Sequence, residues 1–255
     1  MVAPGGKIHA IYRYPVKGLS PEPLTRTQLA IGATLPADRL YAIENGPSGF
    51  DPAAPRHQPK QRYLMLMRNE RLARLCTRFD DASHTIVIAT EGREAARGDL
   101  RTAEGRAAIE RFFAGFCADE LRGAPKVLHA PGFSFSDVAR KVVSIINLSS
   151  LTAIEGVIER AVHPLRFRGN VYLTGWPAWR ELDLVGREIA FGTLARLRII
   201  KRIVRCAATN VDPDTGIRDL AIPDTLMRRF EHADCGIYGE VVEGGEIAVG
   251  DELSN

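Results

Sequence analysis

Apolar and polar residues alternate along several short stretches of the chain, the pattern expected of half-buried β-strands. Residues 7–14 (KIHAIYRY) alternate up to a proline, residues 84–90 (HTIVIAT) are rich in β-branched side chains, and residues 141–147 (KVVSIIN) form an apolar run. Further strands are expected at 26–31, 39–44, 168–174, 188–191, 194–204 and 246–249. Short strands separated by Gly, Pro and Asp turns predict a β-rich fold, either a barrel or a sandwich.

Three segments show helical spacing instead. Between residues 105 and 121, apolar side chains recur every three or four positions, which predicts an amphipathic helix with Cys117 in the core. A second helix is expected after Ser149 or Ser150, either of which would cap its N-terminus. A third is expected within residues 222–230. The sequence therefore predicts a β-rich α+β protein with helices packed on the flanks of a sheet.

The length and composition bound the domain organisation. With 255 residues, 45% of them apolar and 25% charged, the chain can form one large domain or two small ones with ample core. The Gly- and Pro-containing stretch near residues 123–136 predicts a boundary between parts 1–122 and 123–255, packed as one unit. Residues 47–62 contain four prolines and are expected to form a loop.

The charge pattern narrows the classes of partner. A formal net charge of +3, with both signs interspersed, argues against electrostatic binding to nucleic acid. We find no signal-peptide pattern and no apolar run of membrane-spanning length, so we expect a cytoplasmic protein without membrane contact. Basic residues crowd at 160–168 and 196–205, which indicates a local anion site. The four cysteines are widely spaced and are expected to be reduced thiols.

Cys206 is the first candidate for chemistry. It lies where an apolar, basic strand (LARLRIIKRIVR) gives way to a turn-rich loop (AATNVDPDTG). Arg202 and Arg205 lie close in sequence, and nearby cations favour the thiolate form, which is a nucleophile and a metal ligand. The alternative is that Cys206 is a small buried hydrophobic residue, as many lone cysteines are.

Two basic motifs are candidates for anion binding. The turn YPVKGLS brings Lys17, a glycine and the hydroxyl of Ser20 together, as in a modest phosphate nest. In RFRGN, strand alternation would place Arg166 and Arg168 on one face, where both could bind an oxyanion. A plain turn and a solvated strand edge are the respective alternatives.

Two further motifs favour structural roles. Asp212 and Asp214 flank a proline and could act as an acid-base pair, but a turn in which an Asp side chain bonds its own backbone is the better interpretation. His232 and Cys235 lie three positions apart, but no CxxC or HxxxH partner accompanies them. Local packing is therefore favoured over a zinc site.

Taken together, the motifs resemble those of the MOSC superfamily over nearly the whole chain. YPVKGLSPEPL and ADRLYAI resemble its N-terminal β-barrel domain, and RFRGNVYLTG, ELDLVGREIAFG, RCAATNVDPDTG and HADCGIYGEVVEGGEIAVGDEL resemble the MOSC domain itself. The block RCAATNVDPDTG is the most specific of these because it surrounds the family's cysteine. The resemblance implies a MOSC β-barrel with flanking helices and a smaller N-terminal β-barrel-like domain.

The resemblance also implies a cofactor and a set of site residues. In the family, the counterpart of Cys206 ligates the molybdenum of a molybdenum cofactor (molybdopterin) or carries persulfide sulfur. Asp212 or Asp214 could then orient water or protons. The cofactor-binding residues implied by position are Lys17, Ser20, Arg39, Asn147, Ser149, Ser150, Arg168, Asn170, Arg205 and Tyr238.

Three functions are compatible with these residues. The first is a molybdenum-dependent oxidoreductase that reduces small N-hydroxylated substrates. It would need a separate electron-transfer protein, because no cysteines with ferredoxin spacing are present. The second is a non-catalytic carrier of cofactor or sulfur with a persulfide on Cys206. The third is a thiol-dependent hydrolase with His232 as the base beside Cys206.

Overall fold

Fifteen β-strands and three α-helices are formed by residues 5–254, the part of the chain that the computed structural model describes. The strands are β1 (Lys7–Arg13), β2 (Glu22–Leu24), β3 (Arg26–Leu29), β4 (Ala42–Glu44), β5 (Cys76–Asp80), β6 (Thr85–Thr90), β7 (Arg93–Asp99), β8 (Lys126–Leu128), β9 (Val143–Asn147), β10 (Val171–Thr174), β11 (Glu188–Phe191), β12 (Ala195–Val204), β13 (Asp234–Glu243), β14 (Gly245–Ala248) and β15 (Leu253–Ser254). The helices are α1 (Ala103–Phe116), α2 (Leu148–Ile158) and α3 (Ile222–Phe230). The predicted β-rich α+β class is confirmed.

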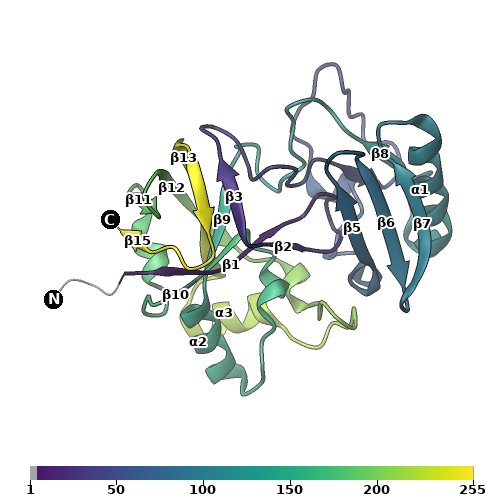
Figure 1. Cartoon of the computed structure of the whole chain (residues 1–255). Helices are drawn as coiled ribbons and strands as arrows, with labels where there is room; N and C mark the ends of the chain where they lie inside the picture. Colours follow the sequence, from purple (N-terminus) through teal and green to yellow (C-terminus); the bar gives the residue numbers. More distant parts are fainter. Residues whose placement is uncertain (1–4, 255) are drawn as a thin grey trace.

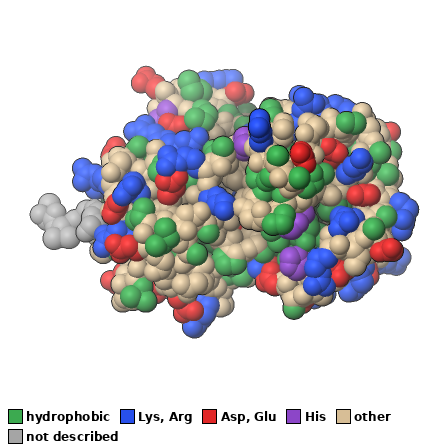
Figure 2. Space-filling view, turned by 90° about the horizontal axis from the view of Figure 1, so that it is seen from above, with side chains coloured by type: hydrophobic (Ala, Val, Ile, Leu, Met, Phe, Trp, Pro, Cys, Tyr) green, Lys and Arg blue, Asp and Glu red, His purple; other side chains and the backbone are tan. Residues whose placement is uncertain are grey.

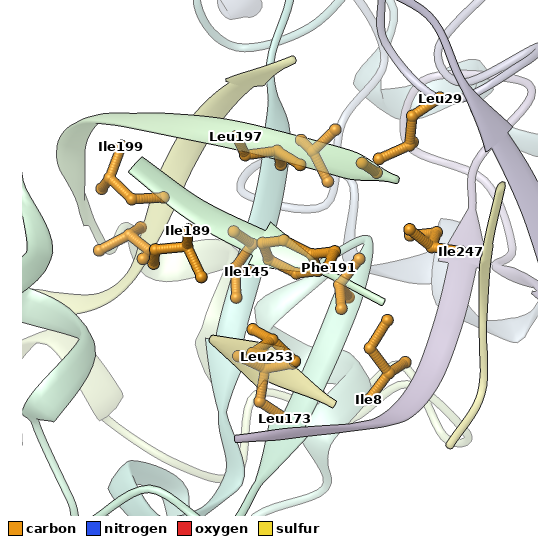
Figure 3. Close-up of a cluster of buried hydrophobic side chains, with 14 of the residues drawn as sticks. Ile8, Leu29, Ile145, Leu173, Ile189, Phe191, Leu197, Ile199, Ile247 and Leu253 are labelled. Atoms are coloured by element: carbon orange, nitrogen blue, oxygen red, sulfur yellow. The ribbon is translucent and has the colours of Figure 1, made fainter. Parts of the chain in front are cut away.

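An eight-stranded sheet forms the larger part of the molecule. Its order is β15-β11-β12-β13-β9-β10-β1-β2, and all neighbours are antiparallel except β9 and β10. The sheet curls into a half-barrel, and β3 pairs with β14 beside it (Figure 1). Figure 3 shows the side chains that fill its interior, with Phe191 among Ile8, Ile145 and Leu253.

Both faces of the central strands are buried, and alternate residues supply two different cores. On β9, Ile145 points into the half-barrel whereas Ile146 packs with residues of α2 and α3 on the opposite face. On β10, Leu173 and Tyr172 divide in the same way. Helices α2 and α3 lie together on this outer face (Figure 1). We call the half-barrel, β3, β14 and these helices the barrel lobe.

The second lobe is built from the intervening segment of the chain. Strands β5, β6 and β7 form an antiparallel sheet, α1 packs against β7, and β4 pairs with β8 (Figure 1). Their buried side chains, including the predicted core residue Cys117, form a separate hydrophobic cluster. We call this part the small lobe. Within residues 5–254, no helix combines the length and apolar character needed to cross a membrane.

The chain crosses between the lobes early. Strand β1 pairs with β10, and β3 pairs with β14, so both strands contribute to the barrel lobe. Between them, Val16 and Leu19 pack in the hydrophobic cluster of the small lobe. Arg13 of β1 then bonds both Glu22 and Asp81, which ties β1 to the β5–β6 hairpin. The boundary after residue 122 stays a prediction. The pairing shows that both sequence parts share one sheet.

Some element ends differ from the predictions. Helix α2 is capped by Asn147, whose side chain accepts a hydrogen bond from the backbone N–H of Ser149, so the expected serine cap is wrong. The strand expected from residue 168 begins only at Val171. A short 3₁₀ turn (Pro164–Phe167) precedes it, and Arg168 adopts a left-handed conformation with φ 50°. The predicted strand alternation of Arg166 and Arg168 is therefore wrong.

Candidate functional site

A cavity of about 290 Å³ is lined by residues from both sequence parts. Its lining contains eight basic residues and only two acidic ones. On the face shown in Figure 2, by contrast, Lys and Arg side chains over the barrel lobe are mixed with Asp and Glu. The excess of basic over acidic residues in the lining is larger than the formal net charge of +3 of the whole chain, so the positive charge is concentrated in the cavity. Its charged and thiol-bearing lining residues are Lys17, Asp38, Arg39, Lys60, Asp137, Arg166, Arg168, Lys201, Arg202, Arg205 and Cys206.

Cys206 lies in this lining, immediately after β12. It adopts an extended conformation and starts a 3₁₀ turn (Ala207–Asn210). The backbone N–H and the hydroxyl of Thr209 both donate to the carbonyl oxygen of Cys206, at 3.0 and 2.9 Å. These bonds fix the backbone that carries the thiol. The side chain is half-buried and its sulfur borders the cavity.

The nearest cation to the sulfur is Lys60, which donates to Cys206 Sγ at 3.2 Å. Lys60 begins a one-turn 3₁₀ helix (Lys60–Arg62) at the end of the proline-rich segment. Burial lowers its pKa, but the charges of Asp137 and Cys206 outweigh burial and raise it. Sequence reasoning missed this residue and expected Arg202 and Arg205 beside the sulfur instead. In the structure, Arg202 donates to the backbone carbonyl oxygen of Leu182. Arg205 donates to the carbonyl oxygens of Cys235 and Phe167.

Two arginines of the cavity lining lie against the buried aromatic ring of Tyr14. The guanidinium carbons of Arg39 and Arg168 each lie 4.3 Å from the ring centroid. Both residues adopt the left-handed backbone conformation, with φ of 52° and 50°. Arg39 pairs with Asp38, and that charge outweighs burial and raises the pKa of Arg39. Burial, together with the charge of Arg39, lowers the pKa of Arg168.

Lys17 is a buried cation of the cavity lining. Its ammonium group donates to the carbonyl oxygen of Phe135 at 2.8 Å and pairs with Asp137. Burial lowers the pKa of Lys17 despite this pair. The two lysines, Lys17 and Lys60, outweigh burial and hold the pKa of Asp137 well below its usual range. The turn needs Gly18, because at φ +83° a Cβ would lie 2.8 Å from the backbone oxygen of Leu64.

Three further predicted residues line the cavity and also make contacts that stabilise the fold. Asn170 accepts from the hydroxyl of Ser144 at 2.7 Å, which ties the start of β10 to β9. Arg205 donates to the carbonyl oxygens of Cys235 and Phe167. Tyr238 packs its ring beneath Lys201, whose Nζ lies 5.6 Å from the ring centroid. Burial and the charge of Asp137 raise the pKa of Tyr238.

Four predicted cofactor-binding residues are absent from the cavity lining. The hydroxyl of Ser20 accepts from the backbone N–H of Thr77 on the edge strand β5. Asn147 and Ser150 both donate to the buried carboxylate of Glu181, at 2.9 and 2.7 Å. Ser149 contributes the backbone N–H that Asn147 caps. The structure thus places these residues in a strand edge and in a helix cap.

The predicted acids lie at a turn. Asp212 Oδ1 accepts from the backbone N–H groups of Asp214 and Thr215, and its other oxygen accepts from Arg166 at 2.9 Å. Burial opposes ionisation, but the bonds from Thr215 outweigh it and lower the pKa of Asp212. Asp214 is exposed, and neither acid belongs to the cavity lining. Asp212 therefore anchors the loop that follows Cys206.

His232 is not brought to the thiol of Cys206. Its ring packs edge-on against Trp179, with centroids 5.3 Å apart, and Nδ1 accepts from the backbone N–H of Asp234. It does not belong to the cavity lining. The hydrolase alternative thereby loses its expected base. Burial raises the pKa of the neighbouring Cys235 thiol to about 12, as expected of a packed residue.

The comparisons with known proteins agree on the family. The MOSC domain model matches residues 126–254, half of the chain, and the protein belongs to the MOSC domain family. Mitochondrial amidoxime reducing component 2 of Bos taurus is 30% identical over 123 residues, covering 44% of this chain and 36% of the relative. Mitochondrial amidoxime-reducing component 1 of Mus musculus is 27% identical over 121 residues, covering 43% and 35%. The match thus spans about a third of each relative's length.

Solved structures also match. The YuaD protein of Bacillus subtilis aligns with a TM-score of 0.44 at 11% identity, covering 98% of this chain and 94% of that one. YiiM of Geobacillus stearothermophilus aligns with a TM-score of 0.34 at 18% identity, covering 44% and 52%.

Proposed function

We propose that this protein binds a molybdenum cofactor and that Cys206 Sγ is the protein's ligand to the metal. The observation that carries the proposal is a thiol on the wall of a cavity whose lining is strongly basic. Membership of the MOSC family and similarity to proteins named amidoxime reducing components support a molybdenum-associated function. A thiolate suits the soft chemistry of a dithiolene-bound molybdenum better than a carboxylate does.

The residues fit such a cofactor. Its phosphate and pterin would be held by Lys17, Arg39 and Arg168, which border the cavity and are largely buried. The eight basic residues of the lining, against two acidic ones, suit the negative charge of the cofactor's phosphate. When bound, the cofactor would supply oxygen-atom transfer coupled to two-electron chemistry at its metal.

We infer further that the reaction is the reduction of N-hydroxylated or related small substrates, with electrons from a separate protein partner in the cytoplasm. Cys206 would hold the metal, and the ammonium group of Lys60 would lie beside the sulfur. Asp212 would act at a distance by fixing the loop of Cys206 through Arg166. The names of the two relatives, which describe amidoxime reduction, support this substrate class.

A second candidate function uses the same sulfur. The thiol of Cys206 is accessible from the cavity, and the ammonium of Lys60 lies 3.2 Å away. Such a cation would stabilise the negative charge of a persulfide. The protein would then carry sulfur or cofactor without turnover.

Metal analysis separates these functions. The protein is purified from a host that makes the cofactor, as wild type, Cys206→Ser and Cys76→Ser, the last being a control because Cys76 is exposed on β5 and outside the cavity lining. We expect about one molybdenum per chain in wild type and control, and its loss in Cys206→Ser. Wild type without molybdenum that releases thiocyanate on cyanide treatment would favour the carrier. Absence of both signals contradicts both functions.

A further inference from the structure

The proline-rich segment brings a cation to the cavity. Lys60 is held against Cys206 Sγ at 3.2 Å, and a quarter of its side chain remains exposed. The 3₁₀ turn that begins at Lys60 contacts the barrel lobe through Cys206, which follows β12, and the small lobe through the bridge between Tyr63 and Glu44. The ammonium group is therefore held in place by both lobes.

The charge of Lys60 is only partly compensated. Its nearest carboxylate is Asp137, with Oδ2 at 3.8 Å, and the other oxygen of Asp137 already pairs with Lys17. One carboxylate thus serves two ammonium groups. Even with Cys206 ionised, the eight basic residues of the cavity lining outnumber its two acidic residues and the thiolate, which leaves a net positive charge. Lys201 and Arg202, both exposed, belong to the same lining and add to it. The space beside the sulfur consequently lies in a positive electrostatic potential.

We propose that Lys60 determines specificity, selecting small molecules that carry a carboxylate or another oxyanion next to the group that reacts at the metal held by Cys206. This inference rests on the proposed function and names the charge class of its substrates. A small molecule in contact with Sγ, about 4 Å from it, lies within about 7 Å of the ammonium group. In a partly desolvated cavity, opposite charges at that separation attract strongly enough to discriminate between charged and neutral molecules.

The test compares two molecules of one shape and different charge, benzoate and benzamide. Their dissociation constants are measured by titration calorimetry with the purified protein. We expect wild type to bind benzoate more tightly, and Lys60→Met to reduce this preference at least tenfold. Lys60→Arg should retain it within about threefold, because the charge remains. Lys126→Met is the matched control, since Lys126 is exposed on β8 outside the cavity lining and its loss changes the net charge equally.

A second measurement uses turnover of the loaded protein. The substrates are an N-hydroxylated benzamidine and its ring-carboxylated analogue. Lys60→Met should lower the ratio of kcat/KM for the carboxylated substrate to kcat/KM for the neutral one at least tenfold. Molybdenum content is measured in the same samples. A wild type without metal would refute the proposed function while the benzoate preference still tests Lys60. Equal preference in wild type and Lys60→Met, or an equal loss in Lys126→Met, would overturn the inference.

Discussion

Replacing Arg166 with methionine should destabilise the protein far more than an equivalent change nearby. Arg166 is 2% exposed, and its Nη2 pairs with Asp212 at 2.9 Å and Asp219 at 2.7 Å. Its Nη1 donates to the carbonyl oxygen of Asn210, within the turn that follows Cys206. Removing this guanidinium leaves two carboxylates without their buried partner while the shape of the stem is largely kept.

The magnitude follows from burial. Breaking a buried ion pair by removing one partner costs about 3–5 kcal/mol, and the lower end applies here because the carboxylates are 21% and 27% exposed. Arg160 provides the control, because it pairs with the same Asp219 but is 56% exposed. Arg160→Met should cost about 1 kcal/mol or less. A loss of about 3 kcal/mol would leave a typical domain folded at room temperature.

Urea unfolding followed by circular dichroism gives both free energies, and hydrogen exchange shows where the effect falls. Arg166→Met should accelerate amide exchange at residues 207–219, the loop that it anchors, whereas Arg160→Met should leave residues 207–212 protected. Equal free energies of unfolding for the two variants would refute the idea that burial of the Arg166 pairs stabilises the loop of Cys206.

Three further outcomes follow from the structure. Burial raises the pKa of the Cys117 and Cys235 thiols to about 12. Two of the four thiols should therefore react with Ellman's reagent at pH 8 in the native protein, and all four in urea. Rapid reaction of all four thiols in the native protein would contradict this. Gly236 has φ +84°, and a Cβ there would lie 2.5 Å from a backbone oxygen of β9, so Gly236→Ala should cost about 3 kcal/mol in urea unfolding, and a cost below 1 would be inconsistent. Hydrogen bonds from Arg101 lower the pKa of Asp99 to about 2. Its stabilising effect is then present above pH 4 and lost as the pH falls toward 2, so the Tm difference between wild type and Asp99→Asn should shrink over that range, and a constant difference would argue against it.

Local patterns predicted the regular elements well. Helix α3 has the predicted bounds, and Cys117 lies in the core as the spacing of apolar residues indicated. The pattern was less informative where several neighbouring residues compete for one role. Asn147, Ser149 and Ser150 are all good N-cap residues, and the outcome depends on where the buried strand β9 ends.

The sequence predicted only some of the residues of the candidate site. Motif resemblance supplied Lys17, Arg39 and Arg168, which do line the cavity. It did not supply Lys60 or Asp137, because both lie in irregular segments whose positions depend on contacts distant in sequence. The contact between Lys60 and Cys206 spans 146 positions, and neither helical nor strand periodicity carries information over that separation.

The region that matches the MOSC model does not complete the site by itself. It includes Cys206 and Arg168, but Lys17, Arg39 and Lys60 all precede residue 126. It also lacks β1, whose removal would leave the apolar strand β10 at the edge of the sheet, paired only with β9. We therefore expect a fragment of residues 123–255 to aggregate or to unfold without cooperativity, as measured by size-exclusion chromatography and thermal circular dichroism against the full chain. A monomeric fragment with a cooperative transition would show instead that the half-barrel folds without the N-terminal strands.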